Sequence, residues 1–421
     1  MLASRILQTT RFISDVNHRF NNKKLIQKSD AEWLKNRLQD MGPTYIKIGQ
    51  FISARRDIFD KHIVDTLKDL QDKVNPIEKD VVKEIIQNAQ GFDKFRKIEI
   101  DPIASASIGQ VHRGLLKSGQ EVVIKVRRPD IERTINLDIK ILTTLLDFIQ
   151  MLGLANVAET REILEDFRDF VLKEADYRIE VDNMNIFYSF NKDHDVLVIP
   201  RPIEPMCTSD VLVMEYKPSS KIQEVKHKLT DVERRVLAFK LMDVFVIHLI
   251  NDGVIHGDPH EGNFGIRGDN IVMYDFGNMI TIDADIRHQM KRLVFELMVE
   301  NIDAALDVLR NLSVVSVRDE ESLKMYLKKY IEYFKTLDVR VFKFSDKEMY
   351  STLPIKLDGV IFRLIRAFGM IEGICKDLDP EFNYNDVFMK YVDMLFMDPN
   401  FVEYKMKTDI KSILRMMMNV L

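Results

Sequence analysis

One short segment of the chain contains three residues whose side-chain oxygen atoms can bind a cation, namely Asp258, Asn263 and Asp275. The segment reads HGDPHEGN from residue 256 and YDFG from residue 274, with a hairpin turn predicted at Gly268-Asp269 between them. Any one piece alone is typical of a loop whose polar side chains bind local backbone groups. Together, at this spacing, the pieces predict a cation-binding site, because hard cations prefer oxygen ligands of this kind.

The spacing matches the catalytic segments of protein kinases, which place an Asn five residues after a catalytic Asp and continue to Asp-Phe-Gly. In phosphoryl transfer, one carboxylate orients the acceptor, while Asn and Asp oxygens hold the magnesium that neutralises phosphate charge. The segment therefore predicts Asp258 as a catalytic residue and Asn263 and Asp275 as metal ligands, with ATP and Mg²⁺ as cofactors.

Upstream, residues 122–125 read VVIK and match the kinase strand whose lysine binds the α- and β-phosphates. Alone, Lys125 would be typical of an edge lysine with an extended apolar stem. The preceding stretch stands where kinases have a glycine-rich loop, but alanines occupy the first two glycine positions, and alanine restricts φ. The nucleotide contacts predicted there are Ile103, Ala104, Ser105, Ala106, Ser107, Ile108, Gly109 and Val111.

Lys125 needs an acidic partner on a helix, and residues 173–180 offer Glu174, Asp176 and Glu180. Glu174 and Glu180 are six residues apart, about 240° around one helix, so they cannot share a face. One should face Lys125 and another should act elsewhere or remain solvated. The residues themselves leave the choice open.

Residues 211–216, reading VLVMEY, are typical of a strand that leads into an adenine-binding linker. Met214 would lie behind the adenine, and backbone groups of Glu215 and Tyr216 would read its edge. An ordinary core strand explains each side chain equally well when it is taken singly.

Periodicity and turn residues predict a small β-containing region followed by a large α region. Residues 30–72 are helical with one break at Gly42-Pro43, after which Thr44 is a candidate cap. Strands are expected over 98–126, with a hairpin turn at Ser118-Gly119. A break is also expected at Asn75-Pro76.

Downstream, residues 159–190 form one long amphipathic stretch, and 196–199 with 211–214 are interpreted as a strand pair. A helix over 231–251 ends near Gly253, and helical periodicity dominates beyond Asp283. The prediction is an α+β, two-lobed protein-kinase-like fold. Its expected parts are a basic leader (1–30), a helical extension (31–96), an N-lobe (97–216) and a helical C-lobe with catalytic loop and tail (217–421).

Composition narrows the function classes. Charged residues make up 30% of the chain but nearly cancel, with a net charge of −5, which argues against nucleic-acid binding. Two cysteines, Cys207 and Cys375, stand far apart, so we expect no disulfide framework and a reducing, intracellular compartment. No segment predicts a membrane span. The leader has two open interpretations, a mitochondrial-type presequence or a solvated amphipathic helix.

The chain resembles the UbiB/ADCK (aarF-domain) family of atypical kinases over about residues 40–283. The resemblance is carried by GPTYIKIGQ from residue 42, by the alanine-rich loop, and by EADYRIE from residue 174. It implies that Glu180 is the partner of Lys125. It also implies that Lys47 and Gln50, on the helical extension, regulate the site with Glu174 and Asp176 close by. In this family the extension occupies the peptide-binding space, and members are linked to coenzyme Q or other isoprenoid-lipid metabolism.

Departures from the family pattern are Glu261 in place of a proline, Arg56 in place of another, and Asn278 after Asp-Phe-Gly. Many relatives end in membrane-spanning helices, whereas residues 412–418 are short and predict an amphipathic segment with possible contact to a lipid surface. After Gly277 the chain passes quickly to an expected helix over 286–299, without Ala-Pro-Glu, so no peptide substrate is expected.

Three functional hypotheses follow. The first is an ATP- and magnesium-dependent kinase or ATPase, in which Lys125, Asp258, Asn263 and Asp275 converge on one nucleotide. The second is a nucleotide-binding regulator without relevant turnover. The third, a Ser/Thr protein kinase, is disfavoured by the alanine-rich loop and the missing peptide platform.

Overall fold

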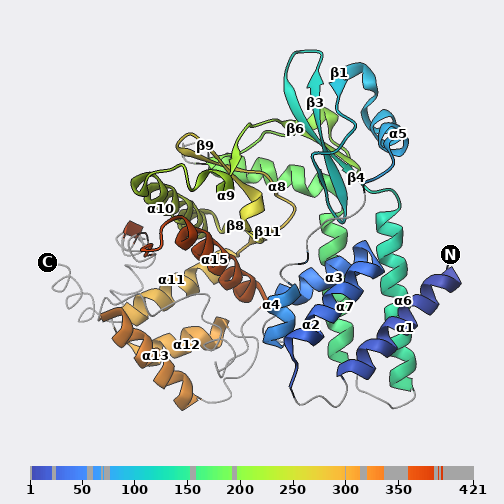
Figure 1. Ribbon diagram of the computed structural model, residues 1–421. Coiled ribbons are helices and arrows are strands. Elements are labelled where there is room, and N and C mark those ends of the chain that lie inside the picture. Colours follow the sequence, from blue (N-terminus) through green and yellow to red (C-terminus); the bar gives the residue numbers. More distant parts are fainter. Residues whose placement is uncertain are drawn as a thin grey trace. The chain divides into compact units, whose positions relative to one another are not determined.

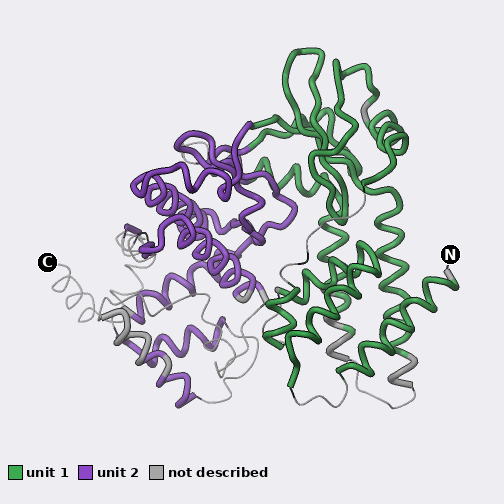
Figure 2. The backbone as a smooth tube through the Cα atoms, in the orientation of Figure 1, with its two compact units in different colours: residues 1–186, 200–217 green, residues 187–199, 218–421 purple. Residues whose placement is uncertain are grey.

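The computed structural model describes residues 2–20, 25–54, 60–67, 70, 76–151, 158–191, 197–298, 300–312, 320–335, 359–383, 387 and 390–391. The chain divides into two compact units (Figure 2). Unit 1 comprises residues 1–186 and 200–217, and unit 2 comprises residues 187–199 and 218–421. Each unit is therefore formed by two separate stretches of the chain.

Unit 1 combines a small sheet with many helices (Figure 1). Its helices are α1 (Leu2–Phe20), α2 (Lys28–Met41), α3 (Pro43–Ala54), α4 (Lys61–Leu67), α5 (Lys79–Gln90), α6 (Ile131–Met151), α7 (Ala158–Glu174) and most of α8 (Tyr177–Phe190). Its strands are β1 (Phe95–Ile98), β2 (Ala104–Ser105), β3 (Gly109–Leu116), β4 (Glu121–Arg127) and β6 (Val211–Glu215).

The sheet of unit 1 is antiparallel in the order β1-β3-β4-β6, with β2 added to β3. Strand periodicity sends alternate residues of β4 to opposite faces. Val122, Ile124 and Val126 lie in one buried cluster with Val82 and Ile86 of α5. Helix α5 therefore covers one face of the sheet, and the intervening residues of β4 are directed to the other face.

The helices of unit 1 bury two apolar clusters that meet at α3. Phe12 of α1 and Tyr45 of α3 belong to the first cluster, with residues of α2 and α4. Phe51 of α3 packs against the second, which α6 and α7 share with Ile108 of the loop before β3. The two faces of α3 thus join the N-terminal helices to the loop that precedes β3.

Unit 2 is mainly helical around short sheets. Its helices are α9 (Ile222–Val225), α10 (Asp231–Ile247), α11 (Ala284–Met298), α12 (Ile302–Leu312), α13 (Glu320–Lys335) and α15 (Gly359–Leu378). Its strands are β5 (Leu197–Val198), β7 (Ser220–Lys221), β8 (Val254–His256), β9 (Phe264–Arg267), β10 (Asn270–Met273) and β11 (Met279–Thr281). The strand orders are β5-β10-β9-β7 and β11-β8.

Helix α10 of unit 2 is capped at its N-terminus and packs against α15. Thr230 caps its N-terminus by accepting a hydrogen bond from Glu233 N, and the Glu233 carboxylate accepts one from Thr230 N. Phe245 of α10 meets Phe368 of α15 edge to face, with 6.5 Å between ring centroids. Helix α15 is thereby held against the middle of the unit.

The α+β kinase-like fold is confirmed, together with both predicted hairpins. Gly119 (φ +89°) turns β3 into β4, and Gly268 (φ +59°) turns β9 into β10, conformations that favour glycine. The helix over 231–251 is also present, as α10 followed by a π-helical turn that ends at Gly253 (φ +67°).

Three local expectations are wrong. Residues 159–190 are not one helix, because α7 ends at Glu174 and α8 begins at Tyr177. Thr44 is not a cap: it is the second residue of α3, buried, whereas Gly42 O accepts the first backbone hydrogen bonds. The two strands near 197 and 211 do not pair with each other, because β5 pairs in parallel with β10 and β6 pairs with β4.

Within the described part of the chain, no helix is both long enough and apolar enough to cross a membrane. Several sequence-based expectations lie outside the described residues. These are Lys23 and Lys24 of the basic leader, the substitution at Arg56, the break at Asn75 and the amphipathic segment 412–418. The domain boundaries drawn from the sequence stay predictions.

Candidate active site

Lys125 and Glu180 form an ion pair inside unit 1. Lys125 lies in the middle of the sheet, where its Cα pairs with those of Val111 in β3 and Leu212 in β6. It extends from the face opposite α5, and its Nζ lies 2.5 Å from Glu180 Oε1 at the start of α8. Only 12% and 5% of the two side chains are exposed, and the ion pair offsets part of the cost of burying each charge.

The alanine-rich segment forms a closed turn beside β3. Ala104 and Ser105 make up β2, and Ala106 N donates to Gly109 O at 2.8 Å. Arg128, which follows β4, donates from its side chain to Ala106 O and to Ser105 Oγ, both at 2.9 Å. The turn is therefore held by an arginine that the sequence motifs did not point to.

The second half of this segment is packed tightly into unit 1. Ile108 and Ser107 are buried, whereas Ile103 is 54% exposed. A Cβ on Gly109 would lie 2.6 Å from Val126 O, so the backbone approach here requires glycine. The Ser107 hydroxyl has no hydrogen-bond partner among the described residues. A buried hydroxyl left in this state costs free energy unless a ligand or water satisfies it.

The predicted adenine-reading strand uses its backbone donors within the sheet. Met214 is buried in β6. Glu215 N donates to Arg201 O at 2.9 Å, and Tyr216 N donates to Glu121 O at 3.1 Å. A base bound along this segment therefore has to use groups other than these two N–H donors.

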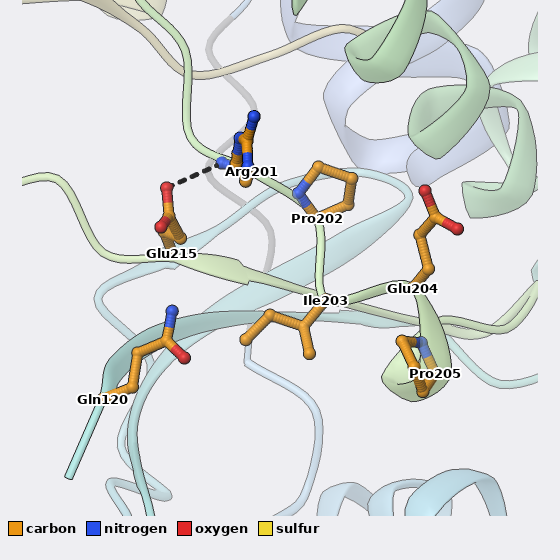
Figure 3. A pocket seen from close by; sticks show the side chains of 7 residues that line it. All are labelled: Gln120, Arg201, Pro202, Ile203, Glu204, Pro205 and Glu215. Atoms are coloured by element: carbon orange, nitrogen blue, oxygen red, sulfur yellow. Dashed lines mark hydrogen bonds between the residues drawn. The ribbon is translucent and has the colours of Figure 1, made fainter. Parts of the chain in front are cut away.

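A shallow pocket of about 410 Å³ lies at the end of β6 (Figure 3). Its lining residues are Gln120, Arg201, Pro202, Ile203, Glu204, Pro205 and Glu215. The Glu215 carboxylate accepts a hydrogen bond from Arg201 N at 3.1 Å and pairs with Lys217 at 2.8 Å. The lining contains neither Lys125 nor any residue of the alanine-rich turn, so the pocket does not coincide with the predicted phosphate-binding residues.

In unit 2, His256 links the two halves of the catalytic segment. Asp258 N donates to His256 Nδ1 at 3.0 Å, and His256 Nε2 lies 2.7 Å from Asp275 O. Since Nδ1 accepts, Nε2 must carry the proton, and the imidazole is neutral. Burial lowers the pKa of His256, while the charges of Asp275 and Asp258 act in the opposite direction.

Asn263 and Asp275 are fixed by the same local network. Asn263 is buried, and its Nδ2 donates to Asp258 O at 3.1 Å, which leaves the amide oxygen as the group that can bind a cation. Tyr274 N donates to Asn263 O at 3.0 Å, and Gly277 N donates to Asp275 Oδ1 at 2.9 Å. Phe276, between Asp275 and Gly277 in the sequence, is fully buried.

The predicted regulatory residues lie in the helical part of unit 1. Lys47 Nζ of α3 lies 2.5 Å from Glu174 Oε1 at the end of α7. Gln50 Nε2 donates to Leu70 O at 3.4 Å. Asp176, expected near Lys47 and Gln50, directs its carboxylate to Arg178 at 2.6 Å, and this hydrogen bond lowers the pKa of Asp176.

The break between α7 and α8 explains how two nearby acids serve different lysines. The argument that Glu174 and Glu180 lie about 240° apart on one helix was wrong, because they belong to different helices. Glu174 pairs with Lys47 and Glu180 pairs with Lys125. The sequence left the second acid with either another task or a solvated position, and the change of helix lets Glu174 pair with Lys47.

Two departures from the expected pattern have direct partners. Glu261, in place of a proline, accepts a hydrogen bond from Gln223 of α9 at 2.5 Å. Asn278 O accepts from Gly257 N at 2.8 Å and so joins the segment after Asp-Phe-Gly to the catalytic loop. Neither residue displaces Asp258 or Asp275.

Sequence reasoning missed one residue at Asp258. Arg366 Nη2 of α15 lies 2.6 Å from Asp258 Oδ1. The two residues are 108 positions apart, and no spacing rule connects them. One feature of the sequence could have indicated a basic partner from elsewhere in the chain: the loop 256–263 contains no lysine or arginine.

Comparison with known proteins assigns the chain to a protein family. Residues 69–309, more than half of the sequence, match the ABC1 atypical kinase-like domain. The chain belongs to the ABC1 atypical kinase-like family. The expected UbiB/ADCK relationship is thereby confirmed.

Two relatives resemble the chain over most of its length. The chain is 29% identical to the chloroplast protein Activity of BC1 complex kinase 8 of Arabidopsis thaliana, covering 88% of this chain and 54% of that protein. It is 29% identical to the uncharacterized protein sll0095 of Synechocystis, covering 84% and 65%. The chain thus spans between about half and two thirds of these relatives.

A solved structure shares the ABC1 chain's fold. The complex of Rv3197 with erythromycin from Mycobacterium tuberculosis superimposes with a TM-score of 0.58, at 21% identity, over 79% of this chain and 88% of that one. Within the fold, Lys125 belongs to unit 1, whereas Asp258, Asn263 and Asp275 belong to unit 2. Their convergence on one nucleotide stays a prediction.

Proposed function

We propose that this ABC1-family chain is an ATP- and Mg²⁺-dependent phosphotransferase or ATPase of the UbiB type. The Lys125–Glu180 ion pair carries the proposal, since active kinases hold their phosphate-binding lysine by an acid on a helix. The pair is buried, and a buried lysine without a functional task would be expensive to keep. The hydrogen-bonded catalytic segment of unit 2 supports the same function independently.

Nucleotide binding fits the groups available in unit 1. Lys125 would bind the α- and β-phosphates as a point charge held by Glu180. The Ser107 hydroxyl, buried in the alanine-rich turn, would gain an acceptor from a phosphate oxygen. Arg128 supports the turn through two side-chain hydrogen bonds, so the turn would be preorganised before nucleotide arrives.

Magnesium fits the oxygen donors of unit 2. Asn263 would bind through its amide oxygen and Asp275 through its carboxylate. Mg²⁺ commonly binds one or two protein carboxylates together with water and substrate phosphates, and Asp275 with Asn263 would supply ligands of this kind.

Asp258 would accept the proton of the acceptor hydroxyl or water. His256, neutral and buried, would keep the backbone at Asp258 and Asp275 in place. Lys125 would orient the phosphates, and bound magnesium would supply neutralisation of the charge that develops on them. These roles are assigned residue by residue and remain proposals.

The acceptor is proposed to be a small molecule or a lipid-linked group, as in isoprenoid quinone metabolism. The support comes from the segment after Asp-Phe-Gly. Strand β11 (Met279–Thr281) follows Gly277 almost at once, and α11 begins at Ala284. Typical protein kinases build their peptide platform from a long segment at this point.

An ADP-release assay tests the proposal. Asp275→Asn should abolish Mg²⁺-dependent ADP formation and leave the circular dichroism spectrum unchanged, because the amide is isosteric but uncharged. Asp269→Asn, at an exposed turn of unit 2, is the matched control and should keep parental activity. Parental turnover by Asp275→Asn would contradict the metal assignment.

The assay also separates the alternative functions. Adding isoprenoid-phenol mimics or anionic liposomes should raise ADP formation if the acceptor is lipid-linked. ATP-induced thermal stabilisation without ADP under any of these conditions would instead indicate a nucleotide-binding regulator. Transfer of phosphate to peptides would indicate a protein kinase.

A further inference from the structure

The side chain of Asp258 is engaged by an arginine from outside the ABC1 domain match. Arg366 Nη2 lies 2.6 Å from Asp258 Oδ1, with 27% and 37% of the two side chains exposed. The domain match ends at residue 309, whereas Arg366 lies on α15. A helix beyond the matched domain therefore reaches the residue proposed to handle the acceptor proton.

Helix α15 is held firmly enough to position a side chain. Phe368, two residues after Arg366, packs against Phe245 of α10. Near the C-terminal end of α15, Asp377 pairs with Lys226 at 2.6 Å. The helix also contacts β11, which pairs with β8 immediately before the catalytic loop. Both partners of the Arg366–Asp258 contact thus rest on packed elements of unit 2.

The catalytic loop supplies no cation of its own. Residues 256–263, reading HGDPHEGN, contain neither lysine nor arginine. Negative charge accumulates around a phosphoryl group in transfer, and an uncompensated carboxylate beside it would be repelled. A fixed guanidinium offsets this charge and restricts the carboxylate through charge-assisted hydrogen bonding.

Stability does not account for the contact. Both groups keep access to water, and ion pairs of this kind contribute little to the free energy of unfolding. The expected consequence of losing Arg366 is therefore a change in the behaviour of Asp258 rather than unfolding. This makes the contact testable by substitution.

We propose that Arg366 is a positioning residue for Asp258, so that α15 completes the acceptor side of the site. The inference rests on the proposed function. In the proposed step, Asp258 accepts the proton of the acceptor hydroxyl or water while the acceptor oxygen bonds to the γ-phosphorus. The bond from that phosphorus to the β–γ bridging oxygen breaks, and ADP leaves with this electron pair. Arg366 sets the direction of the Asp258 carboxylate during the transfer.

The test compares Arg366→Gln, Arg366→Lys and Asp258→Asn in the full chain, by steady-state ADP release at varied Mg·ATP. Arg366→Gln should lower kcat roughly 10- to 100-fold, the size of loss that follows removal of a group that orients a metal ligand. The KM for ATP and its Kd should stay at parental values, because Arg366 acts on the acceptor side. Arg366→Lys should restore part of kcat, since it keeps the charge but loses the planar fork.

Two further measurements sharpen the result. The double variant Asp258→Asn/Arg366→Gln should be no slower than Asp258→Asn alone, because Arg366 acts through that carboxylate. Arg363→Gln, at an exposed position one turn away on α15, is the matched control and should keep parental kcat.

The outcomes are distinguishable. Unchanged or increased kcat in Arg366→Gln, or a loss that adds in full to that of Asp258→Asn, would overturn this inference while leaving the proposed function intact. An increase would show that the contact is inhibitory. A parental protein that binds ATP but forms no ADP would overturn the proposed function and this inference together.

Discussion

The ion pair between Lys125 and Glu180 allows a quantitative test of the site in unit 1. Glu180→Gln keeps the shape of the side chain and removes its charge. Lys125, which is 12% exposed, then loses the negative charge of Glu180. Lys125→Met removes the opposite charge and keeps most of the apolar stem, and the double variant removes both charges.

The expected size of the effect follows from burial. Breaking a buried ion pair by removing one partner costs about 3–5 kcal/mol, because the remaining charge stays desolvated and has lost the opposite charge of that partner. Each single variant should therefore lose about 3 kcal/mol of the free energy of unfolding. The double variant should lose less than the sum, with a coupling of about 1–3 kcal/mol. Lys97 and Glu99, whose side chains are 68% and 44% exposed, form a matched control pair. Glu99→Gln should cost at most about 1 kcal/mol.

Trp33 makes the measurement specific to unit 1. It is the chain's single tryptophan and lies in α2. Urea unfolding followed by its fluorescence reports on the unit that contains the pair. A Glu180→Gln protein within about 1 kcal/mol of the parent, or strictly additive losses in the double variant, would refute the reasoning. Either result would mean that solvent or another group compensates the lysine.

Two further predictions concern the ion pair between Arg5 and Asp138 and the buried imidazole of His256. Arg5→Ala should lower the free energy of unfolding by about 3–5 kcal/mol in the Trp33 assay, because Arg5 pairs at 2.7 Å with the fully buried Asp138. Arg11→Ala, exposed on the same helix, should change it by less than about 0.5 kcal/mol, and equal losses would contradict the assignment. Burial lowers the pKa of His256 below its ordinary value of 6.5, so this imidazole binds a proton more readily in the unfolded chain than in the folded one. The neutral, buried imidazole therefore contributes to the free energy of unfolding above about pH 6.5, and this contribution is lost as the pH falls below that value. His256→Gln should flatten this acid slope in circular dichroism melts, whereas the exposed control His227→Gln should keep it; an unchanged slope in His256→Gln would argue against a buried neutral imidazole.

Much of the fold and of the catalytic segment followed from local patterns. Hairpins were predictable at Gly119 and Gly268, because positive φ at a turn favours glycine and leaves a signature in the sequence. The positions of Asp258, Asn263 and Asp275 were predictable for a similar reason, since one strand–turn–strand segment sets their spacing. Local rules failed where two signals overlapped: Thr44 has the chemistry of a cap, but Pro43 already occupies the first turn of α3.

The sequence by itself determined the residue types of the site, the strand carrying Lys125 and the short segment that contains the candidate acids Glu174, Asp176 and Glu180. Only the tertiary structure decided which acid serves which lysine, because the break after Glu174 places Glu174 and Glu180 on different helices. It also decided that Arg366 meets Asp258. Contacts of this kind depend on the packing of distant helices, and the periodicity of neither helix encodes its partner.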